Sequence, residues 1–412
     1  MPAEETVRVA MVVTRSLDVD AVISRVRIMR QIRDAFSAQF SVQVYRLRPL
    51  PEIALAGSWA RMAGRLVSGI VRGRPVPLQC ALYSDKAAID QLTYELAAGG
   101  YDSIYLDSVR SLALLRSLRA RLPHVRIAVD FDDLMSRRME LLAAHDWPIQ
   151  LGHVQKWFSP FILRKAQGTW SRSIARYEAR TLTRAELEAC RLADAVVLVS
   201  PVEAELLRQR VPSGSCDIYG VIPAQAAETK PISVTQPVRF VFIGSDGDGQ
   251  NRQSIDYLLG LWRRERPNSK LHFYGRQHRV YEPVQNVVWN GFVENIAQVY
   301  TEDSILILPV FRAGGIKTKL LEAWGQGRPA LINPLATEGL PLRGYPLAIK
   351  ECEWHKFLAN PAAFHATCIQ AAEIGCRFVA QNLSHDSYAE KWVRIVRGGS
   401  YTNECNLARE EL

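Results

Sequence analysis

Residues 305–341 hold the side chains whose types and spacing point most directly to chemistry. The pair Gly314–Gly315 precedes a stretch with helical spacing, and glycine lets the backbone approach an anion closely. The first N–H groups of a helix have no partner inside it and carry the positive end of its dipole. Lys317 and Lys319 add cations, and Glu322 lies one to two turns into the helix, where a carboxylate accepts hydrogen bonds from ribose hydroxyls. This combination predicts a site for a nucleoside diphosphate.

The order of these residues resembles the donor-binding motif of GT-B glycosyltransferases, especially the bacterial family-four enzymes that build polysaccharides and glycolipids. In that motif a glycine turn is followed by a basic residue, then Glu-Ala, then Gly-x-Pro before a strand. The matching parts here are Gly314–Gly315, Lys317, Glu322–Ala323 and Gly327–Pro329. Retaining members usually carry two glutamates in this motif, the first of them eight residues before the one that matches Glu322. This chain has Gly314 at the first position. The resemblance therefore implies ribose and phosphate recognition, but neither the sugar nor the anomeric outcome.

Short apolar runs alternate with helical stretches in both halves of the chain, which predicts an α/β fold with two parallel sheets. The expected strands are residues 7–14, 101–108, 126–133 and 193–200, then, after a polar linker at 222–236, residues 238–245, 270–276, 286–292, 305–310 and 330–333. The resemblance implies the GT-B arrangement of two Rossmann-like domains whose sheets face each other across a cleft. Residues 1–220, joined by a last helix that crosses back at about 386–412, would bind the acceptor, and residues 221–385 would bind the donor.

Other donor-binding residues follow from the same resemblance. Gly244 and Ser245 come directly after the first strand of the second half. Arg252 lies slightly further on, where the family often supplies a cation to the diphosphate, and Arg276 follows the next strand. Arg252 and Arg276 are also readable as ordinary surface arginines.

Carboxylates after a strand of the first half are the candidates for catalysis. An inverting transfer needs a base, because the acceptor hydroxyl loses its proton during attack. Asp130, Asp132 and Asp133 end the run 126–133. Family members often carry a His-Asp pair here, so the resemblance favours Asp132, which takes the place of the histidine, with Asp133 second. The alternative is that these aspartates cap a helix. Asp18 and Asp20 form another acidic pair, with plain turn residues as their alternative.

Composition limits the partners. The chain of 412 residues carries a formal charge of +9, which favours anions such as nucleotides and lipid phosphates. No zinc-finger spacing or basic tail points to nucleic acid. The N-terminus lacks a basic-then-apolar signal and the seven cysteines form no regular framework, so a cytoplasmic enzyme is expected. None of the eight histidines has a metal-ligand spacing, so neither a metal nor a cofactor is expected.

Two segments carry cations beside apolar residues. In residues 59–74 an apolar stripe (Met62, Leu66, Val67, Ile70, Val71) lies beside four arginines (Arg61, Arg65, Arg72, Arg74). Such a helix either packs its stripe inward or rests on an anionic membrane, and packing is the favoured interpretation. Residues 157–165, with Trp157, Phe158, Phe161 and Ile162 before Arg164 and Lys165, are a second docking segment for a lipid acceptor.

The leading hypothesis is a cytoplasmic glycosyltransferase, associated with the inner face of the membrane. It would move a sugar, expected to be a hexose, from a UDP-, GDP- or dTDP-linked donor to a hydroxyl of a glycan or lipid-linked saccharide in polysaccharide or glycolipid synthesis. One alternative is a nucleotide-sugar 2-epimerase of the same fold. A second is a non-catalytic subunit that binds nucleotide, and the absence of a glutamate at Gly314 keeps it open.

Overall fold

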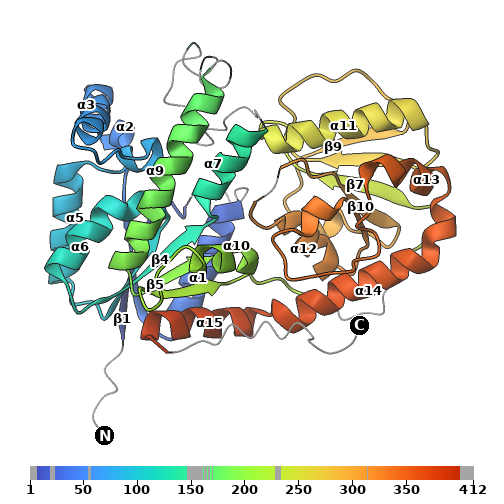
Figure 1. Cartoon of the computed structure of the whole chain (residues 1–412). Helices are drawn as coiled ribbons and strands as arrows, with labels where there is room; N and C mark the ends of the chain where they lie inside the picture. Colours follow the sequence, from blue (N-terminus) through green and yellow to red (C-terminus); the bar gives the residue numbers. More distant parts are fainter. Residues whose placement is uncertain are drawn as a thin grey trace, which may run out of the picture. The chain divides into compact units, whose positions relative to one another are not determined.

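The protein divides into two compact units. The computed structural model describes residues 7–18, 24–53, 57–145, 161, 165, 168, 170–227, 233–312 and 314–399. Unit 1 comprises Met1–Pro223 and Tyr388–Asn403, and unit 2 comprises Ala224–Ser387 and Glu404–Leu412. Each unit is built on one parallel sheet (Figure 1).

Unit 1 has a six-stranded sheet with the order β2-β1-β3-β4-β5-β6. Its strands are β1 (Arg8–Val13), β2 (Ser41–Arg46), β3 (Ser103–Asp107), β4 (Arg126–Asp132), β5 (Ala195–Leu198) and β6 (Asp217–Gly220). Its helices are α1 (Ser24–Ser37), α2 (Leu50–Ile53), α3 (Ser58–Val71), α4 (Leu78–Ala81), α5 (Lys86–Ala98), η1 (Val109–Ser111), α6 (Leu112–Arg121), α7 (Met135–Ala144), α9 (Ser171–Leu192), α10 (Pro201–Arg208) and α15 (His385–Arg397).

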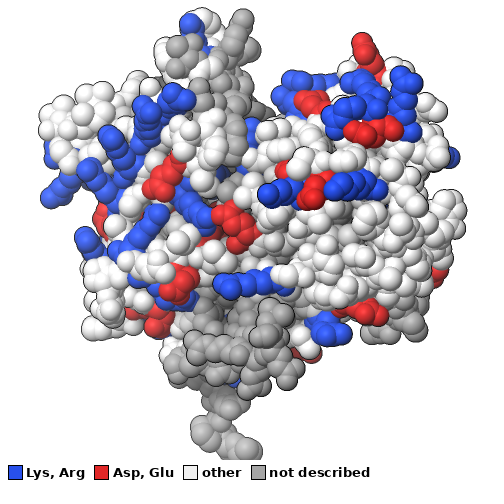
Figure 2. All heavy atoms as spheres, turned by 45° about the vertical axis from the view of Figure 1, so that its right-hand side comes forward, with Lys and Arg blue, Asp and Glu red and all other residues white. Residues whose placement is uncertain are grey.

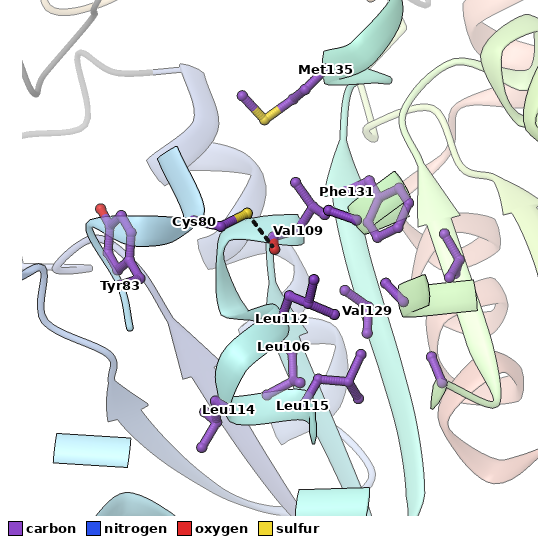
Figure 3. Packing of buried hydrophobic residues seen from close by; sticks show 14 of the residues in the cluster. Cys80, Tyr83, Leu106, Val109, Leu112, Leu114, Leu115, Val129, Phe131 and Met135 are labelled. Carbon is purple, nitrogen blue, oxygen red and sulfur yellow. Dashed lines mark hydrogen bonds between the residues drawn. The ribbon is translucent and has the colours of Figure 1, made fainter. Parts of the chain in front are cut away.

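The core of unit 1 follows from the apolar runs of its central strands. The side chains of β3 are all buried, as expected for a strand that helices cover on both faces. Leu106, Val129 and Phe131 from the sheet pack with Leu112 and Leu115 of α6 (Figure 3). These contacts fix the carboxyl ends of β3 and β4 beside each other.

The last helix of the chain belongs to the first unit. Trp392 of α15 is buried and packs edge-on against Phe36 and Tyr105, at centroid distances of 6.0 and 5.6 Å. Ser103 Oγ donates a hydrogen bond to the carbonyl of Val396 at 2.8 Å. The sequence therefore leaves unit 1 at residue 223 and returns to it at the end.

Unit 2 has a five-stranded sheet with the order β11-β10-β7-β8-β9. Its strands are β7 (Arg239–Ile243), β8 (Leu271–Tyr274), β9 (Val287–Gly291), β10 (Ser304–Leu308) and β11 (Ala330–Ile332). Its helices are α11 (Gly249–Glu265), η3 (Ile296–Gln298), α12 (Thr318–Gly325), η4 (Pro334–Thr337), η5 (Glu351–Glu353), α13 (Trp354–Ala359), η6 (Pro361–Phe364) and α14 (His365–Asn382). Asp248 caps α11 by accepting from the N–H groups of Gln250 and Asn251.

Both parallel sheets agree with the sequence, and the nine expected strands are present with ends shifted by at most a few residues. The edge strands β2 and β6 were not expected. Within the part of the chain that the structure describes, no helix is long and apolar enough to cross a membrane.

The inward packing expected for the apolar stripe of residues 59–74 is wrong for half of α3. Val67, Ile70 and Val71 are 60, 58 and 80% exposed, and none of the described side chains of this helix is fully buried. The stripe is divided, because only Met62 and Leu66 turn part of their surface toward unit 1. An apolar edge therefore remains on the surface.

Candidate functional site

The direction of chain crossing marks one place in each sheet where loops leave to opposite sides. In an open parallel sheet, ligands bind beyond the carboxyl ends of the strands at this point. In unit 2 it lies between β7 and β10, and in unit 1 between β1 and β3. Most of the candidate donor residues follow β7 and β10, and Arg276 follows β8. The candidate catalytic residues lie at the end of β4, the neighbour of β3.

The side chain of Lys319, on α12, reaches the carboxyl end of β7. Its Nζ donates a hydrogen bond to Oδ1 of Asn251 and lies 4.9 Å from the ring centroid of Phe242. A Cβ at Gly244 would come within 2.7 Å of this ammonium group. Glycine is thus needed here so that the cation from α12 can reach the first strand.

The pKa of Lys319 is lowered to about 8, mainly because burial removes water from the ammonium group. Lys317 lowers it further, whereas the carboxylates of Asp248 and Glu322 raise it. A phosphate bound beside Lys319 would supply negative charge that stabilises the ammonium group. The electrostatics therefore favour an anionic ligand.

The turn between β10 and α12 places the start of α12 near these groups. Gly314 and Gly315 have φ values of +101° and +61°, which only glycine adopts without strain. Lys317 donates from Nζ to the carbonyl of Gly314 at 2.6 Å, so its charge is held over the turn. The side chain of the N-cap residue Lys317 makes no capping hydrogen bond to the helix.

Glu322 is 6% exposed on α12. Tyr300 lies close to it: the Tyr300 hydroxyl donates to the carbonyl of Lys319 at 3.4 Å, and the pKa of Tyr300 is raised by burial and by the Glu322 carboxylate. The carboxylate is thus held in a protected place one turn inside the helix.

The other proposed donor residues have structural partners in the loop after β7. The Ser245 hydroxyl donates to the carbonyl of Arg276 at 2.9 Å. Arg252 donates from Nε and Nη2 to the carbonyl of Asp246, both at 3.1 Å. The guanidinium of Arg276 lies over the ring of Phe292, 5.4 Å from its centroid. Ser245 and Arg252 therefore shape this loop, and Arg276 is exposed beside it.

A buried arginine organises the carboxylates of unit 1. Arg25 of α1 forms ion pairs with Asp107 at 2.6 Å, Asp130 at 2.8 Å and Asp132 at 3.2 Å. Tyr105 donates from its hydroxyl to Asp130 at 2.7 Å. Burial raises the pKa of Asp130, while Arg25 and hydrogen bonds from Thr14 hold the pKa of Asp107 below its ordinary value despite burial. The sequence did not reveal Arg25, because its partners lie 82 to 107 positions away.

Asp132 is the carboxylate of this cluster that reaches solvent. Its side chain is 34% exposed, whereas that of Asp130 is 1% exposed. The residue has φ of +68° at an irregularity of β4, which turns its carboxylate toward a hollow of about 50 Å³. Asp133 also lines this hollow and pairs with Arg138.

The helix-cap alternative for these aspartates is wrong. The N-cap residue of α7 is Leu134, whose N–H donates to Glu203, and Glu186 accepts from the N–H of Ser136. Asp132 and Asp133 therefore do not cap α7. Asp18 is exposed and bonds with Ser16. Asp20, Trp157, Phe158, Ile162 and Arg164 lie outside the described residues.

Comparison with known proteins agrees with this geometry. The family model described as Glycosyl transferases group 1 matches residues 237–350, which contain every proposed donor residue. The fold is similar to that of the lipopolysaccharide outer core galactosyltransferase WaaB, with a TM-score of 0.56 and 13% identity over 95% of this chain and 99% of that one. The chain therefore has the GT-B fold.

Two further structures share the GT-B fold. Anabaena HepE in complex with UDP and glucose has a TM-score of 0.58 and 10% identity, over 95% of this chain and 100% of that one. A glycosyltransferase from Rickettsia africae has a TM-score of 0.56 and 10% identity, over 96% and 98%. No curated protein matches the sequence of this chain.

Proposed function

We propose that the protein is a glycosyltransferase, which takes its sugar from a nucleoside diphosphate donor held by unit 2. The observation that carries the proposal is the meeting of Lys319, Asn251 and Gly244 at the end of β7, beside the glycine turn that precedes α12. UDP-linked sugars are the first donors to consider, because the similar fold of HepE has been seen with UDP-glucose. The diphosphate would bind at Gly314, Gly315, Lys317 and Lys319, and the ribose at Glu322.

The chemistry follows from the charges of these groups. As the bond between the sugar and the diphosphate breaks, negative charge grows on the departing oxygen. Lys319, Lys317 and the N–H groups of α12 stabilise that charge without having to reorganise. No metal or cofactor is required for this step, since the leaving group is a diphosphate that cations and N–H groups bind directly.

Asp132 of unit 1 is proposed to accept the proton of the acceptor hydroxyl. A new bond forms between that oxygen and the anomeric carbon, the bond to the diphosphate breaks, and the proton passes to the carboxylate. Asp132 suits this role because it is exposed to the hollow, whereas Asp107 and Asp130 are buried with Arg25. The acceptor is proposed to be a saccharide hydroxyl, carried on a lipid at the inner membrane face.

Thermal unfolding in the presence of UDP-, GDP- and dTDP-sugars tests the donor, because a ligand that binds the folded state raises the midpoint. The matching donor should then be turned over. Asp132→Asn should lower turnover by at least about 100-fold, the usual contribution of a general base, with nucleotide affinity unchanged. The matched control is Asp90→Asn, at an exposed carboxylate of α5 that should leave turnover intact. Full turnover by Asp132→Asn would exclude Asp132 as the base.

A further inference from the structure

A broad groove on unit 1 has no part in the site described above. It has a volume of about 1300 Å³ and is formed by α3 with the turn after it, the start of α6 and the middle of α9. Binding sites for small ligands usually measure about 300–1000 Å³, so this groove is large enough for more than a single sugar.

The walls of the groove are strongly basic. Its described lining includes eight lysine or arginine side chains and one carboxylate, Glu188. Arg116 binds that carboxylate through two contacts of 2.6 and 2.7 Å, and it lowers the pKa of Glu188. Arg74 after α3 and Arg184 on α9 are exposed on opposite walls. Lysines and arginines gather on the surface at the left of Figure 2, with few carboxylates among them.

The position of the groove connects it to the proposed base. Its floor includes Cys80 of α4, whose thiol donates to the carbonyl of Val109 at 3.5 Å (Figure 3). Gln79 and Arg110, the neighbours of Cys80 and Val109, are hydrogen-bonded to each other at 2.5 Å. Arg110 lines the hollow that holds Asp132. The groove and the hollow therefore lie on the two sides of the same pair of segments, α4 and η1.

The rim of the groove carries the apolar edge of α3. Val67, Ile70 and Val71 are exposed beside lining residues such as Ser68 and Arg72. Cations next to exposed apolar side chains suit a molecule with an anionic head and a hydrocarbon tail, because the head meets the cations while the tail leaves water.

We propose that this groove binds the diphosphate of the acceptor, with the hydrocarbon chain that carries it against the exposed edge of α3. This inference rests on the proposed function, since it names the acceptor of that transfer as an amphiphilic diphosphate. The head is anchored in the groove, and the saccharide attached to it extends past α4 and η1 toward Asp132. The basic residues thereby select an acceptor that the donor site does not recognise.

Binding of the full chain to vesicles tests the groove. Phosphatidylcholine vesicles that contain a long-chain prenyl diphosphate should bind the protein, and pure phosphatidylcholine vesicles should not. Inorganic pyrophosphate should compete. The double variant Arg74→Glu/Arg184→Glu should bind at least about tenfold more weakly, since each basic residue near such a surface contributes appreciably. The control Arg180→Glu, an exposed residue of α9 that does not line the groove, should bind like the wild type.

A second variant separates the tail from the head. Ile70→Gln should weaken vesicle binding. Half of the bound protein should then be displaced at a lower concentration of pyrophosphate. Unchanged binding by the double variant, with a circular dichroism spectrum like that of the control, would overturn the proposal. Equal binding to phosphatidylglycerol vesicles without competition by pyrophosphate would also overturn it, because the groove would then recognise only general negative charge. Vesicle binding without any sugar transfer would refute the proposed function, but the groove would still be a binding site for an amphiphilic diphosphate.

Discussion

Replacing Lys319 by methionine should make the protein more stable and the donor site weaker. A fall of the lysine pKa from 10.5 to about 8 corresponds to roughly 3 kcal/mol that the empty fold spends to keep the ammonium group charged. Methionine fills similar space without charge. After allowing for the lost hydrogen bond to Asn251, a gain of about 1–2 kcal/mol in the free energy of unfolding is expected at pH 7.

The pH dependence has a defined sign. Between about pH 8 and 10.5 the unfolded chain holds more protons at Lys319 than the folded one, so this residue makes the wild type more stable as pH rises through that window. The cost is fully present below pH 8. Donor affinity should change in the opposite direction, because the ammonium group loses its proton as pH rises above about 8.

Two measurements at pH 7 check this reasoning, urea unfolding and calorimetric titration with UDP. Loss of a hydrogen bond to a charged group weakens binding by about 1.5–3 kcal/mol, or roughly 10- to 150-fold. Lys270→Met, at an exposed lysine of the same unit, should change neither quantity. A Lys319→Met protein that is less stable than the wild type and binds UDP equally well would refute the argument.

Three further changes address other groups. Glu322→Ala should weaken UDP binding at least about tenfold by calorimetry, since ribose would lose a charged acceptor, whereas Glu302→Ala at an exposed site should not; equal affinities would remove Glu322 from the site. Arg25→Met should lower the free energy of unfolding by about 3–5 kcal/mol at pH 7 in urea, because two buried carboxylates lose their cation; a loss that does not shrink in acid, where the carboxylates protonate, would contradict this. Burial raises the pKa of Glu186 from 4.5 to about 7, so between these pH values the folded state binds a proton that the unfolded chain has lost. The free energy of unfolding should therefore fall by about 3 kcal/mol in total as the pH rises from 4.5 to 7. Glu186→Gln should show a smaller decline in unfolding experiments across that range, and an unchanged profile would be inconsistent with the proton residing there.

The strands and the donor turn were accessible from the sequence because they depend on local patterns. Runs such as residues 305–310 are apolar throughout. The glycine pair before Lys317 predicts a turn whose backbone geometry only glycine adopts readily. β2 was missed because its residues are largely exposed, so it lacks the apolar run that the search relied on. β6 was missed because only the two middle residues of its sequence, Ile218 and Tyr219, are buried, so it has no apolar run.

The carboxylate cluster shows what local patterns leave out. Asp130, Asp132 and Asp133 were recognised as a group from the sequence, but Arg25, which pairs with both Asp130 and Asp132, lies on a helix that follows another strand. Burial of an arginine cannot be read from its immediate neighbours. The exposed edge of α3 was misjudged for the same reason: a stripe predicts that a helix has an apolar face, but not how much of that face finds a partner.

The return of α15 to unit 1 bears on how the enzyme is made. Trp392 completes a cluster with Phe36 and Tyr105, so the first 223 residues leave the ribosome without a part of their own core. Domains commonly fold as they are synthesised, from the N-terminal end onward. Unit 1 can therefore complete this aromatic cluster only after residue 392 has been synthesised, whereas every strand of unit 2 precedes that point.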